Sequence, residues 1–452
     1  MEVFMKRKAY QRLLEWKKQN GTTALLLEGA RRVGKSYLAR EFAQNEYKSH
    51  LFIDFSKAPR LVRQLFEDNL EQLDTLFLKL SEHYGVRLHP RQSLVIFDEI
   101  QAFPRAREAI KALVEDGRYD YLETGSLVSI HENVKDIVIP SEEERLQLHP
   151  MDFEEFLWAN GDDLTMDFIR DHFAARTELG QLLHRKALDL FRQYMIVGGM
   201  PQAVLAFVAS HDLRKADQAK KTILKLYRED IQKHAGRYAL KTQLVFDGIA
   251  SQLSRHEKVF RLASLEKNAR MREYEDAFLW LREAMVANLC YRSTEPNLGL
   301  GINAEYSTLK CYMADTGLLI SQAFGGTPGQ TAEIHRRLLF NALEVNQGML
   351  VENIVAQMLT AAGHELFFFS ATQGNAQERM EIDFLIPTPD ISRRHNIAPI
   401  EVKSSRYYTH ASLDKFQAKY HDFLGQPCLI HSKDLRFSDG VLYLPIYMTP
   451  CL

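Results

Sequence analysis

The sequence ALLLEGARRVGKSYLAREFA, residues 24–43, decides the fold of the N-terminal part of this chain. Its apolar start, ALLLEG, predicts a short buried strand. The sequence from Gly29 to Ser36, GARRVGKS, matches the phosphate-loop pattern GxxxxGK[ST] in full. A helical pattern follows from Lys35 to about Gln44, so the loop lies between a strand and a helix, as this pattern requires.

Each residue type of this loop has a task in binding a nucleoside triphosphate. Glycines let backbone N–H groups converge on the phosphates, and the N-terminus of the helix adds a favourable dipole. Lys35 is expected to reach the β- and γ-phosphates, and the Ser36 hydroxyl to ligate Mg²⁺. We therefore predict ATP and Mg²⁺ as ligands. The predicted cofactor contacts in this region are Gly29, Ala30, Arg31, Arg32, Val33, Gly34, Lys35, Ser36 and Tyr37.

A second motif, LVIFDE at residues 94–99, predicts a buried strand that ends in two carboxylates. Asp98 is expected to hold Mg²⁺ through water, and Glu99 to orient and deprotonate the attacking water. An acidic pair that merely ends a strand is the structural alternative. Beside a phosphate loop, the Asp-Glu pair favours ATP hydrolysis over binding alone.

Two further positions are candidates for contact with the γ-phosphate. The turn Thr124-Gly125-Ser126 closes another predicted strand, and we place a cofactor contact at Ser126, with an ordinary turn as the alternative. Arg145 is the candidate trigger arginine, because a cation stabilises the transition state of phosphoryl transfer. Arg105 and Arg107 compete with Arg145 for this role.

The order of predicted elements indicates more than one domain. Strands at 51–55, 94–100 and 119–126 alternate with helical patterns, which predicts a parallel sheet covered on both faces. From about 150 the pattern is helical, with a break at VGGMP (197–201). Residues 321–335, rich in Gly, Thr and Gln, are the best linker candidate. Strands with helices return after them and predict a second α/β domain.

Composition excludes several classes of protein. Hydrophobic residues make up 46% and charged residues 26% of the 452 residues, the balance of a soluble globular protein. No apolar run could span a bilayer, and the charged N-terminus lacks a signal core, so we expect a cytoplasmic protein without membrane contact. The four cysteines form no CxxC pair, which disfavours a disulfide framework and a zinc site. At a net charge of −2, any contact with nucleic acid needs a local basic patch.

The motifs occur in an order that resembles a known family. RRVGKSYLAREFA, LVIFDEIQAFP, the TGS turn and LQLHPMDFEEFL are followed by YMIVGGMPQAV, LYREDI and KCYMADTGLL. This series is similar to prokaryotic AAA+-type ATPases related to the archaeal ATPases, which carry a C-terminal domain of unknown function. Family members often have Gly-Arg where this chain has Glu144-Arg145, which leaves the placement of the arginine open.

The resemblance implies four parts and an α/β fold class. We predict a P-loop AAA+-type ATPase domain over residues 1–150, a helical lid over 151–235, a winged-helix-like segment over 236–325 and a restriction-endonuclease-like α/β domain over 336–452. The same analogy implies a homo-oligomer.

The last part has residues that suit a nuclease. Glu401 and Lys403 are two apart on a predicted strand and share one face. Asp383 lies on another strand and Glu352 on a helix, an arrangement that resembles PD-(D/E)xK nucleases. Glu352, Asp383 and Glu401 are expected to bind a second Mg²⁺ or Mn²⁺, with Lys403 activating water. The alternatives are solvated charges on a strand, or a scaffold retained for binding only.

A basic stretch before this domain is a candidate DNA-reading helix. Lys267, Arg270, Arg272 and Arg282 lie within residues 261–292, and residues 291–313 are the candidate wing. Glutamates at 266, 273 and 275 weaken this patch, so a solvated helix face is the alternative.

Two hypotheses of function follow. In the first, ATP drives an enzyme that acts on nucleic acid, with the nucleotide state controlling the C-terminal domain. In the second, the protein is a nucleotide-dependent switch that binds a protein partner and has no nuclease activity. A metabolic kinase is disfavoured by the acidic strand end and the additional domains.

Overall fold

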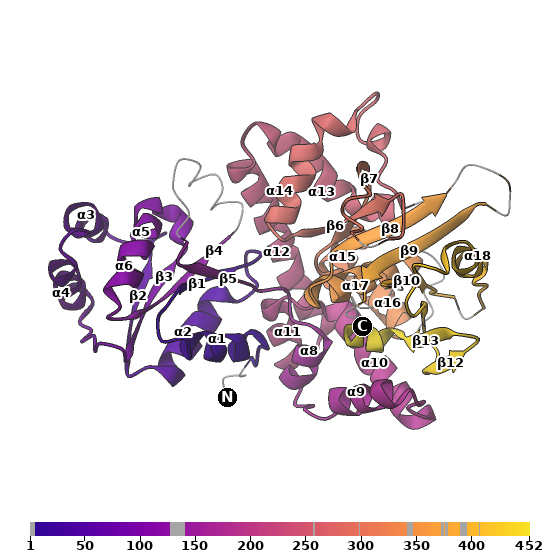
Figure 1. Ribbon diagram of the computed structural model, residues 1–452, viewed down its shortest axis with the longest axis horizontal. Coiled ribbons are helices and arrows are strands. Elements are labelled where there is room, and N and C mark those ends of the chain that lie inside the picture. The colour runs from indigo at the N-terminus through magenta and orange to yellow at the C-terminus, as the bar shows by residue number, and fades with distance from the viewer. Residues whose placement is uncertain are drawn as a thin grey trace. The chain divides into compact units, whose positions relative to one another are not determined.

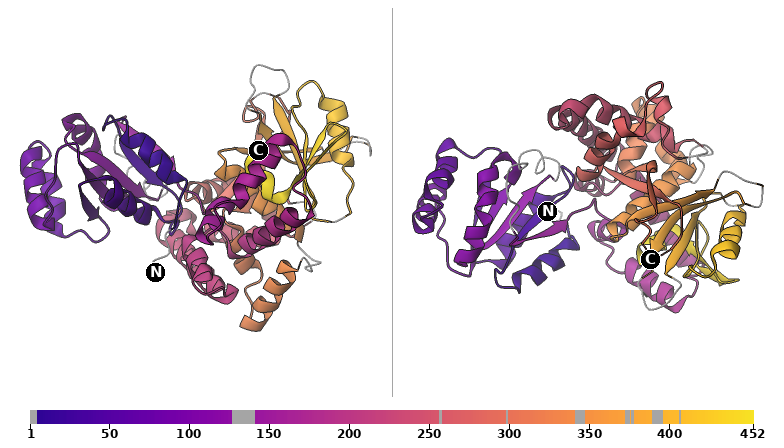
Figure 2. Two further views of the ribbon diagram at one scale, coloured as in Figure 1. Left: turned by 90° about the horizontal axis from the view of Figure 1, so that it is seen from below. Right: turned by 45° about the horizontal axis from the view of Figure 1, so that its top comes forward.

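The computed structural model forms two compact units, which Figure 1 and Figure 2 show from three directions. The N-terminal unit comprises Met5–His149 together with Glu283–Met285, and the C-terminal unit comprises Pro150–Arg282 and Val286–Leu452. The structure describes residues 5–126, 141–255, 258–297, 299–340, 347–371, 375, 378–388, 396–405 and 407–452.

A five-stranded parallel sheet in the order β2-β3-β4-β1-β5 forms the centre of the N-terminal unit (Figure 1). Strands β1, β3 and β4 are buried along their whole length, because both faces of a parallel sheet are covered. The strands of this sheet are β1 (Ala24–Glu28), β2 (Ser49–Asp54), β3 (Ser93–Asp98), β4 (Asp120–Gly125) and β5 (Glu143–Gln147). The predicted parallel sheet is confirmed.

Helices cover both faces of this sheet. Leu26 and Phe97 pack on one face against the helices α3–α6, whereas Leu27 and Ile96 pack on the other against α1 and α2. The helices are α1 (Ala9–Lys17), α2 (Lys35–Glu46), α3 (Arg60–Asn69), α4 (Leu73–Tyr84), α5 (Pro104–Glu108) and α6 (Ile110–Asp116). The phosphate loop therefore joins β1, an inner strand between β4 and β5, to a helix that is packed on the sheet.

The C-terminal unit contains a mixed eight-stranded sheet in the order β12-β13-β11-β10-β9-β8-β6-β7 (Figure 1). The three neighbours β10, β11 and β13 are parallel to one another. The strands are β6 (Ala287–Ser293), β7 (Ala304–Met313), β8 (Leu366–Ala371), β9 (Met380–Pro387), β10 (Ile397–Val402), β11 (Cys428–His431), β12 (Arg436–Ser438) and β13 (Val441–Pro445).

Helices supply most of the remaining C-terminal unit. The predicted helical character of residues 151–235 is confirmed, and so is the break at VGGMP, between α10 and α11. The helices are α8 (Phe153–Ala159), α9 (Thr165–Ala175), α10 (Gln181–Val197), α11 (Pro201–Val208), α12 (Leu213–His234), α13 (Ala239–Leu253), α14 (Glu275–Glu283), α15 (Thr316–Ala323), α16 (Pro328–Leu339), α17 (Gln347–Ala361) and α18 (Ala411–Tyr420). Within the described residues, no helix is long and apolar enough to cross a membrane.

Two expectations about the middle of the chain need correction. The hairpin β6–β7 is not an isolated wing, because β6 also pairs in parallel with β8 and so extends the C-terminal sheet. The predicted linker 321–335 is largely helical, since α16 begins at Pro328. The Thr327 N–H donates to the Gln330 side chain at 3.1 Å, so the residues that look like a linker are a helix start.

The candidate DNA-reading helix is also shorter than predicted. Only Arg282 of the four basic residues lies on an α-helix, α14. Lys267 and Arg270 precede a single 3₁₀ turn that contains Arg272, and Asn268 has a left-handed φ of 66°. A left-handed residue interrupts an α-helix, so these side chains do not share one helical face.

Candidate functional site

The phosphate loop has backbone features that its glycines explain. A Cβ atom at Gly29 would lie 2.4 Å from the Leu148 carbonyl oxygen, so only glycine fits there. Gly34, with a left-handed φ of 102°, directly precedes α2. The Lys35 ammonium is buried and donates to the carbonyl oxygens of Gly29 and Ala30 at 2.9 and 3.1 Å. The loop thus surrounds the Lys35 ammonium, the group that is expected to bind the phosphates.

The predicted magnesium ligands lie together at the carboxyl end of the sheet. The Ser36 hydroxyl donates to Asp98 Oδ1 at 2.6 Å, although the two residues belong to different elements. Thr124 donates to the same carboxylate oxygen, also at 2.6 Å. Hydroxyl and carboxylate oxygens are the donors that Mg²⁺ prefers, so the residues present suit this ion.

Glu99 is positioned by the backbone that follows β3. Its φ of 52° is left-handed, an uncommon conformation for a non-glycine residue that often marks functional sites. Its N–H donates to the Thr124 hydroxyl at 3.3 Å, and its carboxylate accepts from the Gln101 amide. The turn therefore fixes the backbone of the candidate base through Thr124, the residue that also contacts the Asp98 carboxylate.

Thr124, rather than Ser126, is the polar residue of the TGS turn that reaches this site. Its hydroxyl joins Asp98 to the backbone of Glu99, whereas no hydrogen bond to Ser126 is found among the described residues. Arg31 and Arg32 are exposed in the loop, and Tyr37 is 47% exposed in the first turn of α2. The contacts predicted for these three residues and for Ser126 stay predictions.

The candidate trigger arginines have different surroundings. Arg107, which is buried, makes a two-point contact with Glu143 at 2.8 and 3.0 Å, and Arg145 contacts the same carboxylate at 3.2 Å. Burial and Glu143 raise the pKa of the nearby Glu123 well above its usual value. Arg105 instead forms a surface pair with Glu108. Buried Arg107 and exposed Arg145 thus share Glu143 as their partner, and the choice of trigger stays a prediction.

In the C-terminal unit, Glu352 and Asp383 are brought together by a lysine that the sequence reading missed. The Lys310 ammonium, on β7, is fully buried. It lies 3.2 Å from a Glu352 oxygen, 2.9 Å from Glu381 and 3.7 Å from Asp383. Lys258 and the Tyr312 hydroxyl also contact Glu352. We call these six side chains the Lys310 cluster.

The charges of the Lys310 cluster depend on one another. Burial alone would raise the pKa of Glu352, but the ammonium groups of Lys258 and Lys310 lower it to about 2. Burial and the charge of Glu352 raise the pKa of Asp383 to about 6. The cluster is therefore a compensated ion network in which Lys310 neutralises carboxylates from a helix and a strand.

Glu401 and Lys403 pair with each other, with 2.5 Å between a carboxylate oxygen and the ammonium, and the N–H of Val402 between them donates to Asp383 Oδ2 at 2.8 Å. Among the described residues, no hydrogen bond or ion pair joins their side chains to Glu352 or Asp383. No three His, Cys, Asp or Glu side chains in that part of the chain are arranged to hold a metal ion. The predicted second metal site, from Glu352, Asp383 and Glu401, is therefore not shown.

Three family models match the chain. Residues 21–157 match an AAA domain. This segment is therefore similar to AAA domains, and it contains the phosphate loop between β1 and α2. Residues 188–327 and 347–448 match two domains of unknown function, DUF8612 and DUF4143. The predicted AAA-type nucleotide-binding function is supported, whereas the endonuclease-like character of residues 336–452 stays a prediction.

Solved structures also show similarity, at low identity. The Walker-type ATPase Paby2304 of Pyrococcus abyssi is 16% identical, with 71% of this chain and 96% of that chain covered and a TM-score of 0.44. RuvB of Thermotoga maritima is 10% identical, with 68% and 92% covered and a TM-score of 0.31. Drosophila ORC bound to DNA is 15% identical, with 72% and 97% covered and a TM-score of 0.26. No curated protein matches the sequence.

Lys310 and Tyr312, which were not among the predicted site residues, stand out in the sequence. Lys310 and Tyr312 are polar positions in the apolar run TLKCYMA, whose residues 309–313 form the buried half of β7. A charge on the buried part of a strand needs a partner. The identity of that partner, a glutamate on a helix 42 residues later, requires the tertiary structure.

Replacing Thr124 by valine is expected to lower kcat for ATP hydrolysis about ten- to a hundred-fold. Valine keeps the shape but removes a hydrogen bond to a charged carboxylate, which is worth about 1.5–3 kcal/mol. Steady-state ATPase assays at saturating ATP measure the effect. Ser126→Ala is the matched control and should change kcat less than about two-fold, since Ser126 lacks the contact with Asp98. Equal losses in both variants would contradict the role of Thr124.

Proposed function

We propose that this protein hydrolyses ATP with Mg²⁺ at the phosphate loop of its N-terminal unit. The observation that carries this proposal is that the Ser36 and Thr124 hydroxyls both donate to one oxygen of the Asp98 carboxylate. Ser36 and Asp98 are the residues that would hold Mg²⁺, which neutralises charge on the phosphates when it is bound. Glu99 accepts the proton of the attacking water. When ATP binds, the Lys35 ammonium donates its hydrogen bonds to phosphate oxygens instead of the Gly29 and Ala30 carbonyls.

The test is ATPase activity with and without single- and double-stranded DNA. Lys35→Ala is the control, because it removes the ammonium that faces the phosphates. Mg²⁺-dependent phosphate release that is lost in Lys35→Ala is the expected result. Failure of the wild-type protein to bind adenine nucleotides with Mg²⁺ would overturn the proposal. Stimulation by DNA favours an enzyme that acts on nucleic acid, and indifference to DNA favours the switch.

A chain of hydrogen bonds supports the switch hypothesis. The Arg7 guanidinium donates to the loop carbonyl of Val33 at 2.8 Å and to the carbonyl of His149 at 2.6 Å. Burial and Arg7 lower the pKa of His149 to about 4, so that its imidazole is neutral at neutral pH. The N-terminal unit ends at His149. We therefore expect a movement of the phosphate loop to shift the backbone at His149, where the chain enters the C-terminal unit.

The same chain of contacts continues inside the C-terminal unit. The Met151 N–H donates to the Gly199 carbonyl at 2.7 Å, and Tyr194 donates to the Met151 carbonyl at 2.9 Å. The Gly199 N–H donates to Asp315. The motifs LQLHPMDF, VGGMP and ADTG are thus joined by hydrogen bonds. These bonds fix the first residues of the C-terminal unit.

Replacing Arg7 by glutamine is expected to weaken the link between nucleotide binding and the C-terminal unit by at least about five-fold, the lower range of measured coupling between sites. The measurement is hydrogen exchange with and without Mg-ATP in a Glu99→Gln background, which retains ATP. Protection by ATP should persist in the phosphate loop and be lost in residues 194–201. Unchanged protection in both segments would contradict the switch. Arg12→Gln, an exposed residue on α1, is the control.

A nuclease function for residues 336–452 is the second candidate. It is favoured by Glu401 and Lys403, which contact one another as their spacing predicts. Lys403→Ala should then abolish Mg²⁺- or Mn²⁺-dependent cleavage of DNA while ATP hydrolysis continues. Lys419→Ala, an exposed lysine of the same unit, is the control. Cleavage that is equal in the wild-type protein and the Lys403 variant would remove the nuclease claim.

A further inference from the structure

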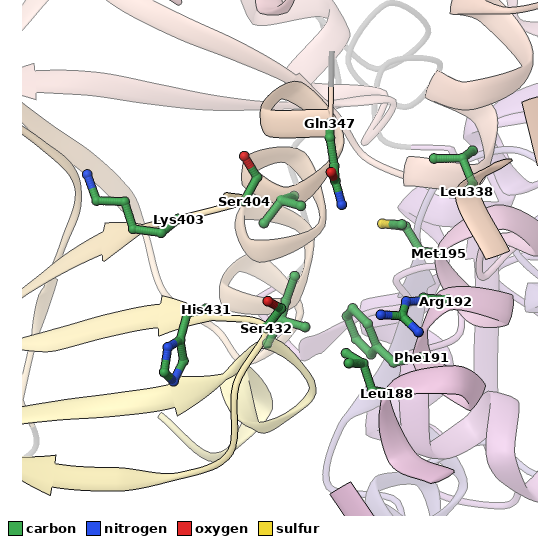
Figure 3. A pocket seen from close by; sticks show the side chains of 12 residues that line it. Leu188, Phe191, Arg192, Met195, Leu338, Gln347, Lys403, Ser404, His431 and Ser432 are labelled. Carbon is green, nitrogen blue, oxygen red and sulfur yellow. The ribbon is translucent and has the colours of Figure 1, made fainter. Parts of the chain in front are cut away.

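A hollow of about 530 Å³, partly open to solvent, lies in the C-terminal unit (Figure 3). One side is formed where three parallel neighbours, β10, β11 and β13, end. Lys403 and Ser404 follow β10, His431 and Ser432 lie at the end of β11, and Ile446 follows β13. Because these three strands are parallel, their carboxyl ends lie together on this side of the hollow.

The opposite side of the hollow is mainly an apolar helix face. Leu188, Phe191, Arg192 and Met195 of α10 line it at spacings of three and four residues, which places them on one face of the helix. Val351 of α17 and Leu338 of α16 add apolar surface. An apolar lining with a few polar groups is the usual composition of small-molecule sites.

The charged side chains that line this hollow are all cationic. None of its lining residues is Asp or Glu, and its two charged residues, Arg192 and Lys403, are both cationic. In Figure 3 the Lys403 and His431 side chains extend away from α10. Lys403 pairs with Glu401, and His431 Nδ1 lies 2.8 Å from the Tyr408 hydroxyl. Arg192 is therefore the cation on the apolar side.

Arg192 is available to a ligand. It lies between Phe191 and Met195 in Figure 3, and its ion pair at 2.9 Å is with Asp189, an exposed residue of the same helix. Such surface pairs contribute little, so an anion in the hollow can replace Asp189. Ser404, Ser432 and Gln347 place hydrogen-bonding groups around the same space.

We propose that this hollow binds a small organic molecule in which an apolar body carries one anionic group. The apolar body packs against Leu188, Phe191 and Met195, and the anionic group accepts hydrogen bonds from Arg192. The site belongs to the C-terminal unit, so this proposal is independent of ATP hydrolysis.

The probe for the test is 1-anilinonaphthalene-8-sulfonate, which joins aromatic rings to one sulfonate and fluoresces in apolar surroundings. The full-length protein is titrated in the presence of Mg-ATP, which keeps the probe from the phosphate loop. We expect saturable binding of one probe per chain. Arg192→Gln should weaken binding about ten-fold, because it removes a charge-assisted hydrogen bond. Val351→Phe, which fills the hollow, should weaken it at least as much.

Two controls separate this site from non-specific binding. Arg185→Gln removes the same charge from an exposed position on the same helix and should leave the affinity unchanged. The neutral analogue N-phenyl-1-naphthylamine should bind wild-type protein and Arg192→Gln equally, since it has no anion. Circular dichroism checks that each variant is folded. Unsaturable binding to wild-type protein, or equal affinity of the sulfonate for wild-type and Arg192→Gln, would overturn the proposal.

Discussion

Replacing Glu99 by glutamine is expected to lower kcat for ATP hydrolysis by about 10²–10⁴-fold, the usual contribution of a general base. Glutamine keeps the size of the side chain but cannot accept the proton of the attacking water. The Mg²⁺ ligands Ser36 and Asp98 remain, so the affinity for ATP should stay within about two-fold of wild type. Single-turnover hydrolysis and a fluorescent ATP analogue measure the two quantities separately.

The control for this variant is Glu108→Gln, which removes an exposed carboxylate on α5 that pairs with Arg105. It should leave both hydrolysis and affinity unchanged. Glu99→Gln with wild-type turnover would show that another group activates the water, and the turn that holds Glu99 would then need another explanation. Loss of ATP binding in Glu99→Gln would instead assign the residue to nucleotide binding.

The second large effect concerns the Lys310 cluster. Replacing Lys310 by methionine is expected to destabilise the C-terminal unit by about 3–5 kcal/mol, because it leaves the buried carboxylates of Glu352 and Asp383 with Lys258 as their remaining counter-charge in the cluster. Glu352 is 2% exposed and cannot be solvated in place. Hydrogen exchange in β7 and α17 as a function of urea measures the stability of this unit. ATP binding by the N-terminal unit should persist.

A double variant tests the cause of this loss. Glu352→Gln in the Lys310→Met background removes the uncompensated charge and should recover part of the lost stability, which a purely steric defect would not allow. Lys433→Met, an exposed lysine of the same unit, should change stability by less than about 0.5 kcal/mol. An unchanged unfolding midpoint in Lys310→Met would show that the cluster contributes no net stability.

The nucleotide site could be predicted in large part because its chemistry is local. The loop from Gly29 to Ser36 is continuous in sequence, and the run before Asp98 is apolar enough to predict a buried strand. The choice between Thr124 and Ser126 could not be made in this way. Phe97 pairs with Glu123, so the next residues on β3 and β4, Asp98 and Thr124, are neighbours. That register is a property of the sheet.

The C-terminal unit was predicted less completely for a related reason. Glu401 and Lys403 meet because residues two apart on a strand share a face. Asp383 lies in a register shift, where β9 places two residues opposite one of β8, and such bulges re-aim side chains. Its carboxylate accepts a hydrogen bond from the Val402 N–H, between Glu401 and Lys403, at 2.8 Å and also lies 3.7 Å from Lys310. Spacing in the sequence cannot locate a bulge, so the contact with Lys310 could not be predicted, and a shared metal site with Glu401 stays a prediction.

The sequence by itself determined the phosphate loop, the acidic end of β3 and the strands of the C-terminal sheet, because each depends on residues that are neighbours along the chain. Only the tertiary structure decided which distant side chains share a site. The Lys310 cluster, the contact of Thr124 with Asp98 and the place of the hairpin β6–β7 all depend on the order and register of strands. These follow from packing of the whole sheet, in which many distant contacts are optimised together.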